Sequence, residues 1–239
     1  MPKFFTAADC ISDKKLKITG EDVAHISKVL RMSVGDFIIV CDGNGNDYDA
    51  EITSITKTEV TADIVRRYLC ESEPSVKVTL FQALPKQGKM EYIIQKTTEL
   101  GVNKIVPVYT KRCVVKPTDK SLRWSKVAQS AAKQCGRGII PEVTPVISFD
   151  DAINLMSGYD CAIMPYECEE KVHLKEIIKD RKYESIAIFI GPEGGFDLSE
   201  TEKAVSVGIR TVSLGKRILR TETASSAVLP VIMYEYDEM

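Results

Sequence analysis

The spacing of hydrophobic residues changes near residue 72, and this change predicts two domains. Residues 37–52 alternate apolar and polar side chains on both sides of the turn sequence DGNG, which predicts a β-hairpin. Residues 58–69 continue as a further strand, and residues 21–32 carry apolar side chains at helical spacing. The polar, proline-bearing segment ESEPS then ends this β-rich unit. We therefore expect a first domain over residues 1–72.

Residues 73–239 follow a different pattern, in which nearly continuous apolar runs alternate with amphipathic ones. The apolar runs predict strands over residues 76–84, 103–110, 159–166, 185–191 and 211–215. The amphipathic runs predict helices over residues 90–100, 121–136, 198–208 and 221–237. This alternation is typical of a parallel sheet that helices cover on both faces, so we expect a second domain of the α/β class.

Two glycine-bearing loops follow predicted strands near the C-terminus. They are GPEGGF (191–196) and LGKRILRTETA (214–224). Ligands of parallel sheets bind at the carboxyl ends of strands, and glycine lets a ligand approach the backbone. The second loop adds Lys216, Arg217 and Arg220, which favour an anionic partner. A tight strand-to-helix turn is the simpler interpretation of the first loop. Neither sequence matches GxxxxGK[ST] or GxGxxG, which argues against nucleotide hydrolysis and nicotinamide chemistry.

Helix caps can be expected beside both loops. Ser199 and Glu202 have the spacing of a capping box for the helix after the first loop. Thr221 or Thr223 is positioned to cap the last helix.

Composition narrows the class of protein. The chain has 239 residues, of which 44% are hydrophobic and 28% charged, as in ordinary globular proteins. We find no apolar run of membrane-spanning length and no signal-peptide pattern at the N-terminus. Seven scattered cysteines without a CxxC pair favour a reducing cytoplasm, so we expect a cytoplasmic protein without a membrane partner. His25 and His173 are too isolated for a metal cluster, and we expect no metal.

Charge is distributed unevenly along the chain. The net charge is -2, but residues 77–137 hold 13 Lys or Arg and three Asp or Glu, a local charge of +10. A basic block in an otherwise acidic chain suggests a surface that binds a polyanion. Solvated helix faces are the alternative explanation.

Several long segments in the same order resemble one family. GPEGGF and LGKRILRTETA resemble motifs of the RsmE family, the 16S ribosomal RNA uridine-N3 methyltransferases of the SPOUT superfamily. HISKVLRMSVGDFIIVCDGNG resembles the N-terminal domain of that family, and EYIIQKTTELGVNKIVPVYTKRCVVK resembles the start of its catalytic domain. RWSKVAQSAAKQCGRGIIPEV extends the match, so the resemblance covers nearly the whole chain.

This resemblance implies a fold and an activity. The fold would be a PUA-like, RNA-binding β-barrel over residues 1–72 and a SPOUT domain over residues 73–239, a parallel sheet with a trefoil knot. The enzyme would be a homodimeric transferase with S-adenosyl-L-methionine as cofactor. Its partner would be 16S rRNA in the small ribosomal subunit, in which it would methylate N3 of one uridine.

The resemblance also implies site residues. The expected cofactor-binding residues, around the crevice of the knot, are Met164, Pro165, Ile190, Gly191, Gly194, Leu214, Gly215, Ile218, Leu219 and Thr223. Stabilisation of a uracil anion would need cations, and the catalytic candidates are Arg112, Arg137 and Arg220. Glu193 would orient the base or remove its proton. The expected RNA-binding residues are Lys3, Arg31, Arg66, Arg67 and Lys111, with Lys3 at a position where the family is expected to carry arginine.

Three alternatives remain open from the residues alone. The chain could be a SPOUT methyltransferase with another RNA target, a non-catalytic RNA-binding module, or a nucleotide-binding enzyme with a doubly wound sheet. Titration with S-adenosylhomocysteine separates the last two from a methyltransferase, because neither predicts affinity for that compound.

Overall fold

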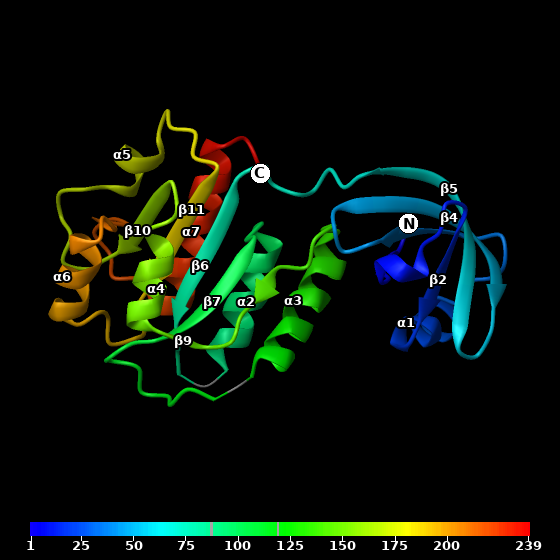
Figure 1. The fold of residues 1–239 in the computed structure, drawn as a ribbon, viewed down its shortest axis with the longest axis horizontal. Coiled ribbons are helices and arrows are strands. Elements are labelled where there is room, and N and C mark those ends of the chain that lie inside the picture. Colours follow the sequence, from blue (N-terminus) through cyan, green and yellow to red (C-terminus); the bar gives the residue numbers. More distant parts are fainter. Residues whose placement is uncertain (87, 119) are drawn as a thin grey trace. The chain divides into compact units, whose positions relative to one another are not determined.

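The structure of the chain is a computed structural model, and it contains two compact units (Figure 1). The structure describes the chain in three stretches, residues 1–86, 88–118 and 120–239. The first unit comprises residues 1–73 and 132–140, and the second comprises residues 74–131 and 141–239. The chain thus leaves the first unit after Glu73 and returns to it for nine residues, a return that the hydrophobic pattern does not reveal.

The first unit is built on a mixed sheet of five strands in the order β1-β3-β4-β5-β2. These strands are β1 (Lys3–Phe5), β2 (Lys15–Thr19), β3 (Phe37–Cys41), β4 (Asn46–Ile55) and β5 (Glu59–Leu69). The β1–β3 pair is parallel and the other pairs are antiparallel. The helical segments are η1 (Ala8–Cys10), α1 (Glu21–Ala24) and the π-helical η2 (His25–Val29).

The predicted hairpin is confirmed as β3 and β4. Its turn is held by the carboxylate of Asp42, which accepts N–H hydrogen bonds from Asn44 at 2.8 Å and Asn46 at 3.1 Å. Inward-facing side chains of the sheet pack with Val23 and Ile26 of the helical segments into one apolar core. Alternation of side chains along the strands therefore buries one face of the sheet, as the sequence predicts.

The second unit contains a fully parallel sheet of seven strands. Its strands are β6 (Lys77–Ala83), β7 (Lys104–Tyr109), β8 (Glu142–Val143), β9 (Ile147–Ser148), β10 (Cys161–Pro165), β11 (Ser185–Ile190) and β12 (Arg210–Val212). The order is β12-β10-β11-β6-β7-β8, and β9 also pairs with β7. Its helices are α2 (Lys89–Glu99), α3 (Ser121–Cys135), α4 (Phe149–Met156), α5 (Leu174–Ile178), α6 (Leu198–Ser206) and α7 (Thr221–Glu235).

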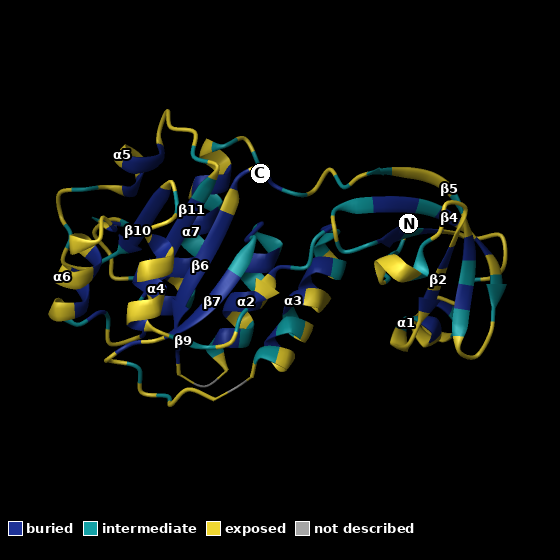
Figure 2. Cartoon of the chain, in the orientation of Figure 1, coloured by how far each residue is buried: buried dark blue, intermediate teal, exposed yellow. Residues whose placement is uncertain are grey.

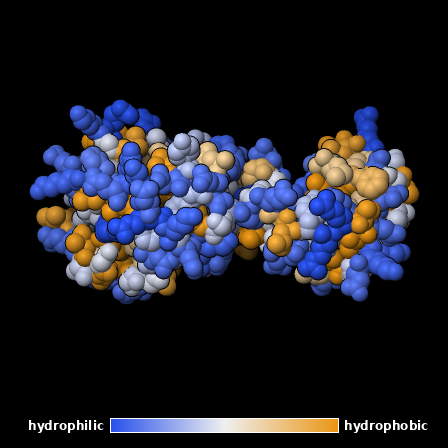
Figure 3. Space-filling model, turned by 90° about the horizontal axis from the view of Figure 1, so that it is seen from above, coloured by the Kyte–Doolittle hydropathy of each residue, from blue (hydrophilic) through white to orange (hydrophobic). Residues whose placement is uncertain are grey.

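Helices cover both faces of this sheet, as the alternation of apolar and amphipathic runs predicts. Phe81 and Phe189 lie in one core with residues of α4 and α6. The neighbouring Gln82 points to the opposite face, where its amide bonds to the first residue of α7. Figure 2 shows the central strands as buried, whereas Figure 3 shows hydrophobic residues scattered among hydrophilic ones on the surface of each unit.

Four elements of the second unit are absent from the prediction. They are the short strands β8 and β9 and the helices α4 and α5. Each is eight residues or shorter, so its hydrophobic period is too brief to separate it from a loop. The strand expected over residues 211–215 ends at Val212, and the residues after it form a loop instead.

Candidate functional site

The two glycine loops line one pocket in the second unit, with a volume of about 450 Å³. The pocket lies at the carboxyl ends of three neighbouring parallel strands, β12, β10 and β11. Its lining consists of residues 165–167, 190–196 and 213–221 together with Ala224. This volume is within the range of roughly 300–1,000 Å³ typical of small-molecule sites.

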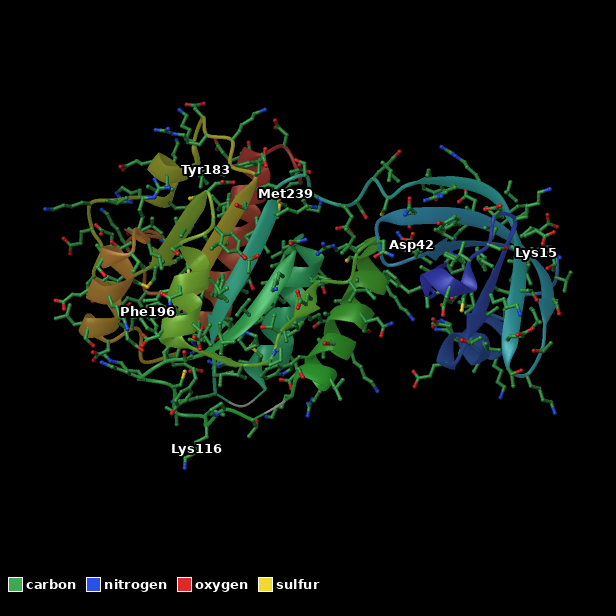
Figure 4. All side chains as sticks on the ribbon, viewed as in Figure 1. Lys15, Asp42, Lys116, Tyr183, Phe196 and Met239 are labelled. Carbon is green, nitrogen blue, oxygen red and sulfur yellow. The ribbon has the colours of Figure 1, made fainter. Side chains whose placement is uncertain are left out.

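The first loop is anchored in the core by Phe196, which Figure 4 labels. Its ring is buried and meets Phe189 edge to face, with the ring centroids 4.8 Å apart. A Cβ atom on Gly191 would come within 3.1 Å of this ring, so a side chain there would displace it. Glycine at position 191 therefore allows the loop to fold back over its own anchor.

A chain of hydrogen bonds ties the first loop to the last helix. Buried Gln82 donates through Nε2 to Thr221 Oγ1 at 2.9 Å, and that hydroxyl donates to the Gly191 carbonyl at 2.7 Å. The expectation that Thr221 or Thr223 caps α7 is wrong. Arg220 is the N-cap residue and provides no side-chain bond, and the Thr221 hydroxyl donates to the Gly191 carbonyl instead of capping the helix.

The second loop presents apolar side chains and a constrained backbone. Gly215 has a φ of +110°, a conformation that L side chains rarely adopt. The side chain of Ile218 is 86% exposed although it is apolar. The exposed side chain of Ile218 offers a flat apolar ligand contact area, and the backbone at Gly215 offers it main-chain hydrogen bonds.

Two carboxylates beside the pocket share one lysine. Lys89 Nζ lies 3.0 Å from Glu193 Oε1 and 3.0 Å from Glu222 Oε2. Burial alone would raise the pKa of Glu193, but hydrogen bonds from its own N–H, from Lys89 and from the Lys86 N–H lower that pKa below its ordinary value. The pKa of Glu222 is lowered in the same way, against burial, by its own N–H and by Lys89. Both groups are therefore carboxylates at neutral pH, and Glu193 is a weak base.

A second layer of residues supports the first loop from outside the pocket. Arg112 Nη1 donates to the Gly194 carbonyl at 3.0 Å, and Arg112 Nη2 lies 3.4 Å from Asp197. Asp197 and Glu200 form the capping box of α6, so the prediction of Ser199 and Glu202 is wrong by two residues. Glu200 is buried, and it also accepts the Lys111 N–H at 2.8 Å.

The structure places most of the expected cofactor-binding residues in the pocket. Eight of them line it, namely Pro165, Ile190, Gly191, Gly194, Leu214, Gly215, Ile218 and Leu219. Met164 instead points into the core of the sheet, because neighbouring strand residues face opposite sides. Thr223 is exposed outside the pocket lining. The lining also includes residues that were not expected there: Tyr166, Glu167, Pro192, Gly195, Phe196, Ser213 and Thr221. Most of these lie inside or next to the quoted motifs.

Two of the four catalytic candidates lie together in the pocket. Arg220 and Glu193 line the pocket, whereas Arg112 lies behind the first loop. Arg137 belongs to the first unit, where its side chain is only 4% exposed and bonds to Glu73 at 2.8 Å. The same Glu73 carboxylate also accepts backbone N–H groups of the residues after Arg137. This buried ion pair gives Arg137 a structural role within the first unit.

The expected RNA-binding residues differ in exposure. The ammonium of Lys3 is buried and bonds to Asp47 at 2.7 Å and to the Gly136 carbonyl at 2.9 Å. The residues Arg31, Arg66, Arg67 and Lys111 are exposed. Among the described residues of the basic block, eight of the 13 cations form ion pairs, which reduces the charge available to a polyanion.

Two kinds of feature are absent from residues 1–86, 88–118 and 120–239. No cluster of three or more His, Cys, Asp or Glu side chains could hold a metal ion. No helix in these stretches combines the length and the apolar character needed to cross a bilayer.

Two family models match the chain. The model described as RNA methyltransferase domain covers residues 71–233, and the one described as RNA methyltransferase PUA domain covers residues 18–65. The first match alone covers more than half of the chain. The division between the matches falls close to the boundary between the two units.

Named relatives match almost the full length. The Ribosomal RNA small subunit methyltransferase E of Bacillus subtilis is 38% identical, with 91% of this chain and 89% of the relative aligned. That of Synechocystis is 30% identical over 96% of this chain and 76% of the relative. A crystal structure of the enzyme from Neisseria gonorrhoeae, bound to S-adenosyl methionine, superposes with a TM-score of 0.89 at 31% identity and covers 99% of this chain and 98% of its own.

Proposed function

We propose a function for this chain on the basis of its family. The chain belongs to the ribosomal RNA small subunit methyltransferase E family. It is an RNA methyltransferase, a transferase with an RNA-methyltransferase PUA domain. We infer that it methylates N3 of one uridine in 16S rRNA of the small subunit, with S-adenosyl-L-methionine as the methyl donor. The single observation that carries this proposal is the pocket formed by both glycine loops.

The residues of the pocket fit the cofactor. Main chain left bare at Gly191 and Gly215 can meet polar groups of an adenosine, and exposed Ile218 with Leu214 and Leu219 suits its flat base. The bound cofactor would supply an electrophilic methyl group on a sulfonium. The protein would contribute mainly by holding the methyl group and the target nitrogen in line.

The nucleophile of this reaction is a ring nitrogen of uracil that must first lose its proton. Uracil N3 carries a proton, and its removal leaves an anion that a cation must stabilise. Arg220 is the favoured residue, since it lines the pocket and forms no ion pair within the described stretches of the chain. Arg112 is already bonded to the first loop, and Arg137 to Glu73. Glu193, with its lowered pKa, would orient the loop rather than remove the proton.

RNA binding would use both units. Arg66 and Arg67 are exposed on β5, and each stacks over a tyrosine ring, at 4.9 Å and 5.7 Å from the centroid. Arg31 and Lys111 add exposed charge. Such cations would bind phosphates and position the RNA, while the target base would be splayed into the pocket. Buried Lys3 would support the fold of this surface rather than bind RNA directly.

We also propose a trefoil knot, a homodimer and a cytoplasmic location. The chain leaves edge strand β12 and returns to the middle of the sheet, where α7 packs on β6, β11 and α2, as a knotted path requires. The outer side of α7 leaves Val231 46% and Tyr234 75% exposed, which suits a second copy of this chain. All seven cysteines are free thiols, as suits a reducing compartment.

The proposal is tested by methyl transfer. Protein, labelled S-adenosyl-L-methionine and small subunits from cells lacking the gene would be mixed, and the digested RNA analysed for 3-methyluridine. Label in 3-methyluridine at one site is expected, and Arg220→Met should lose it while still binding cofactor. Tight cofactor binding with label in another nucleoside, or in other RNA only, would contradict the uridine-N3 assignment.

A further inference from the structure

One carboxylate of the pocket, Glu167, takes no part in the proposed methyl transfer. Glu167 follows β10 by two residues and lines the pocket together with the first loop. β10 pairs in parallel with β11, whose carboxyl end carries that loop. The acidic residue and the glycine loop therefore stand at the same ends of adjacent parallel strands.

The first loop approaches this carboxylate closely at Gly195. Gly195 has a φ of +66°, and a Cβ atom built on it would collide with Glu167 Oε1. No residue with a side chain could replace Gly195 without moving Glu167. The carboxylate therefore lies directly against the second of the paired glycines in GPEGGF.

The carboxylate of Glu167 is also free to accept hydrogen bonds. It is exposed to the pocket, and across residues 1–86, 88–118 and 120–239 it has neither an ion pair nor a hydrogen bond. Its neighbours are different. Glu169 accepts from the Thr211 hydroxyl at 2.7 Å and from the Lys171 N–H at 2.9 Å, and Glu193 is held by Lys89. Glu169 and Glu193 thus have partners within the protein, whereas Glu167 has none in the described stretches.

Strand order tells which part of a ligand this carboxylate would meet. β10 lies between β12 and β11, so Glu167 stands between the apolar second loop and the first loop. A ligand with its adenine on the second loop and its amino-acid end toward the first loop would have its ribose in the middle. Carboxylates accept hydrogen bonds from ribose hydroxyls in other parallel sheets with the same strand-end arrangement.

We propose that Glu167, which lies against Gly195 of the first loop, binds the ribose hydroxyl groups of the cofactor. This inference rests on the proposed function, which supplies the adenosine-containing ligand. It makes Glu167 a cofactor-binding residue that discriminates adenosine from deoxyadenosine compounds. A site built around a hydroxyl group rejects an analogue that lacks this group.

The test compares ligands that differ only at the ribose. S-adenosylhomocysteine and its 2′,3′-dideoxy analogue would be titrated calorimetrically into the wild type, Glu167→Gln and Glu170→Gln. Glu170 is the matched control, because it is exposed in the same loop and outside the pocket lining. Glu167→Gln should weaken S-adenosylhomocysteine about tenfold, as expected for a charged hydrogen bond, and leave the dideoxy analogue unchanged. Glu170→Gln should change neither.

A third ligand excludes the other group that could reach a carboxylate. 5′-Methylthioadenosine keeps the ribose and lacks the amino-acid ammonium, so Glu167→Gln should weaken it as well. An effect on S-adenosylhomocysteine but not on methylthioadenosine would assign Glu167 to the ammonium and overturn the inference. So would equal weakening of the ribose and dideoxy ligands, or no weakening at all. Failure of the wild type to bind S-adenosylhomocysteine would overturn the proposed function itself.

Discussion

Replacement of Lys89 by methionine should destabilise the second unit and loosen the pocket. Methionine keeps most of the side-chain length and removes the charge. Lys89 is the cation shared by Glu193 of the first loop and Glu222 of α7. Without it, two carboxylates remain close together with no positive charge between them.

The magnitude follows from how far these groups are buried. Lys89, Glu193 and Glu222 are 29%, 22% and 17% exposed. Exposed ion pairs contribute about 0.2–1 kcal/mol, and breaking a buried pair costs about 3–5 kcal/mol. For groups of intermediate burial we expect a loss of about 1–2 kcal/mol in the free energy of unfolding. Lys96→Met is the control, because its pair with Glu99 lies within α2 and is worth only about 0.2–0.5 kcal/mol.

The pH dependence gives the sharper test. The pKa values of both glutamates are lowered from 4.5 in the folded protein, so their stabilisation is present above pH 4.5 and is lost as the pH falls through the lowered values. The pKa of Lys89 is raised, chiefly by its bond to Glu222, so it stays charged throughout this range. Denaturation of wild type and Lys89→Met should therefore differ by a constant amount between pH 6 and 8 and converge in acid. A difference unchanged down to pH 3 would refute the assignment of this energy to the carboxylates.

Three further variants test other contacts. Arg137→Met should cost about 3–5 kcal/mol of unfolding free energy by leaving Glu73 buried and unpaired, and denaturant titration would measure it. A loss of unfolding free energy smaller than that of an exposed ion pair would contradict the burial of the Arg137–Glu73 pair. Thr221→Val should cost about 1–3 kcal/mol, because it removes the hydroxyl that donates to Gly191 and leaves buried groups unsatisfied; a thermal midpoint equal to wild type would argue against that bond. Gly215→Val should abolish binding of S-adenosylhomocysteine without unfolding the protein, since the backbone is strained but a Cβ atom meets nothing within 4 Å. Retained affinity would argue against a role for that loop in the pocket.

The sequence predicts the fold well where the hydrophobic period is long. The strands over residues 76–84 and 185–191 and the helix over residues 121–136 recur with each end shifted by at most one residue, as helix and strand boundaries often are. Local capping is harder to predict, because Asp197 with Glu200 and Ser199 with Glu202 have the same spacing. Only the burial of Glu200 against the Lys111 N–H decides between them, and that contact joins residues 89 positions apart.

Contacts between residues distant in the sequence also explain why some site residues are not predicted. Motifs identify the pocket because its walls are continuous segments of chain at strand ends. They do not identify Lys89 or Gln82, whose partners are distant in the sequence. Arg137 looks functional between two glycines, but its partner Glu73 lies 64 residues earlier. Met164 differs from Pro165 only in the direction that alternation gives its side chain.

The nine residues that return to the first unit limit how this protein can be divided. Residues 132–140 supply the Gly136 carbonyl to Lys3, the Gly138 carbonyl to Cys41 and the guanidinium of Arg137 to Glu73. A fragment that stops at Glu73 would lose all three partners and expose a buried carboxylate and ammonium. The N-terminal unit is therefore not a module that can be excised, transplanted or exchanged between relatives by a single cut. A chimera would have to carry both segments, so substitutions in one are expected to be compensated in the other.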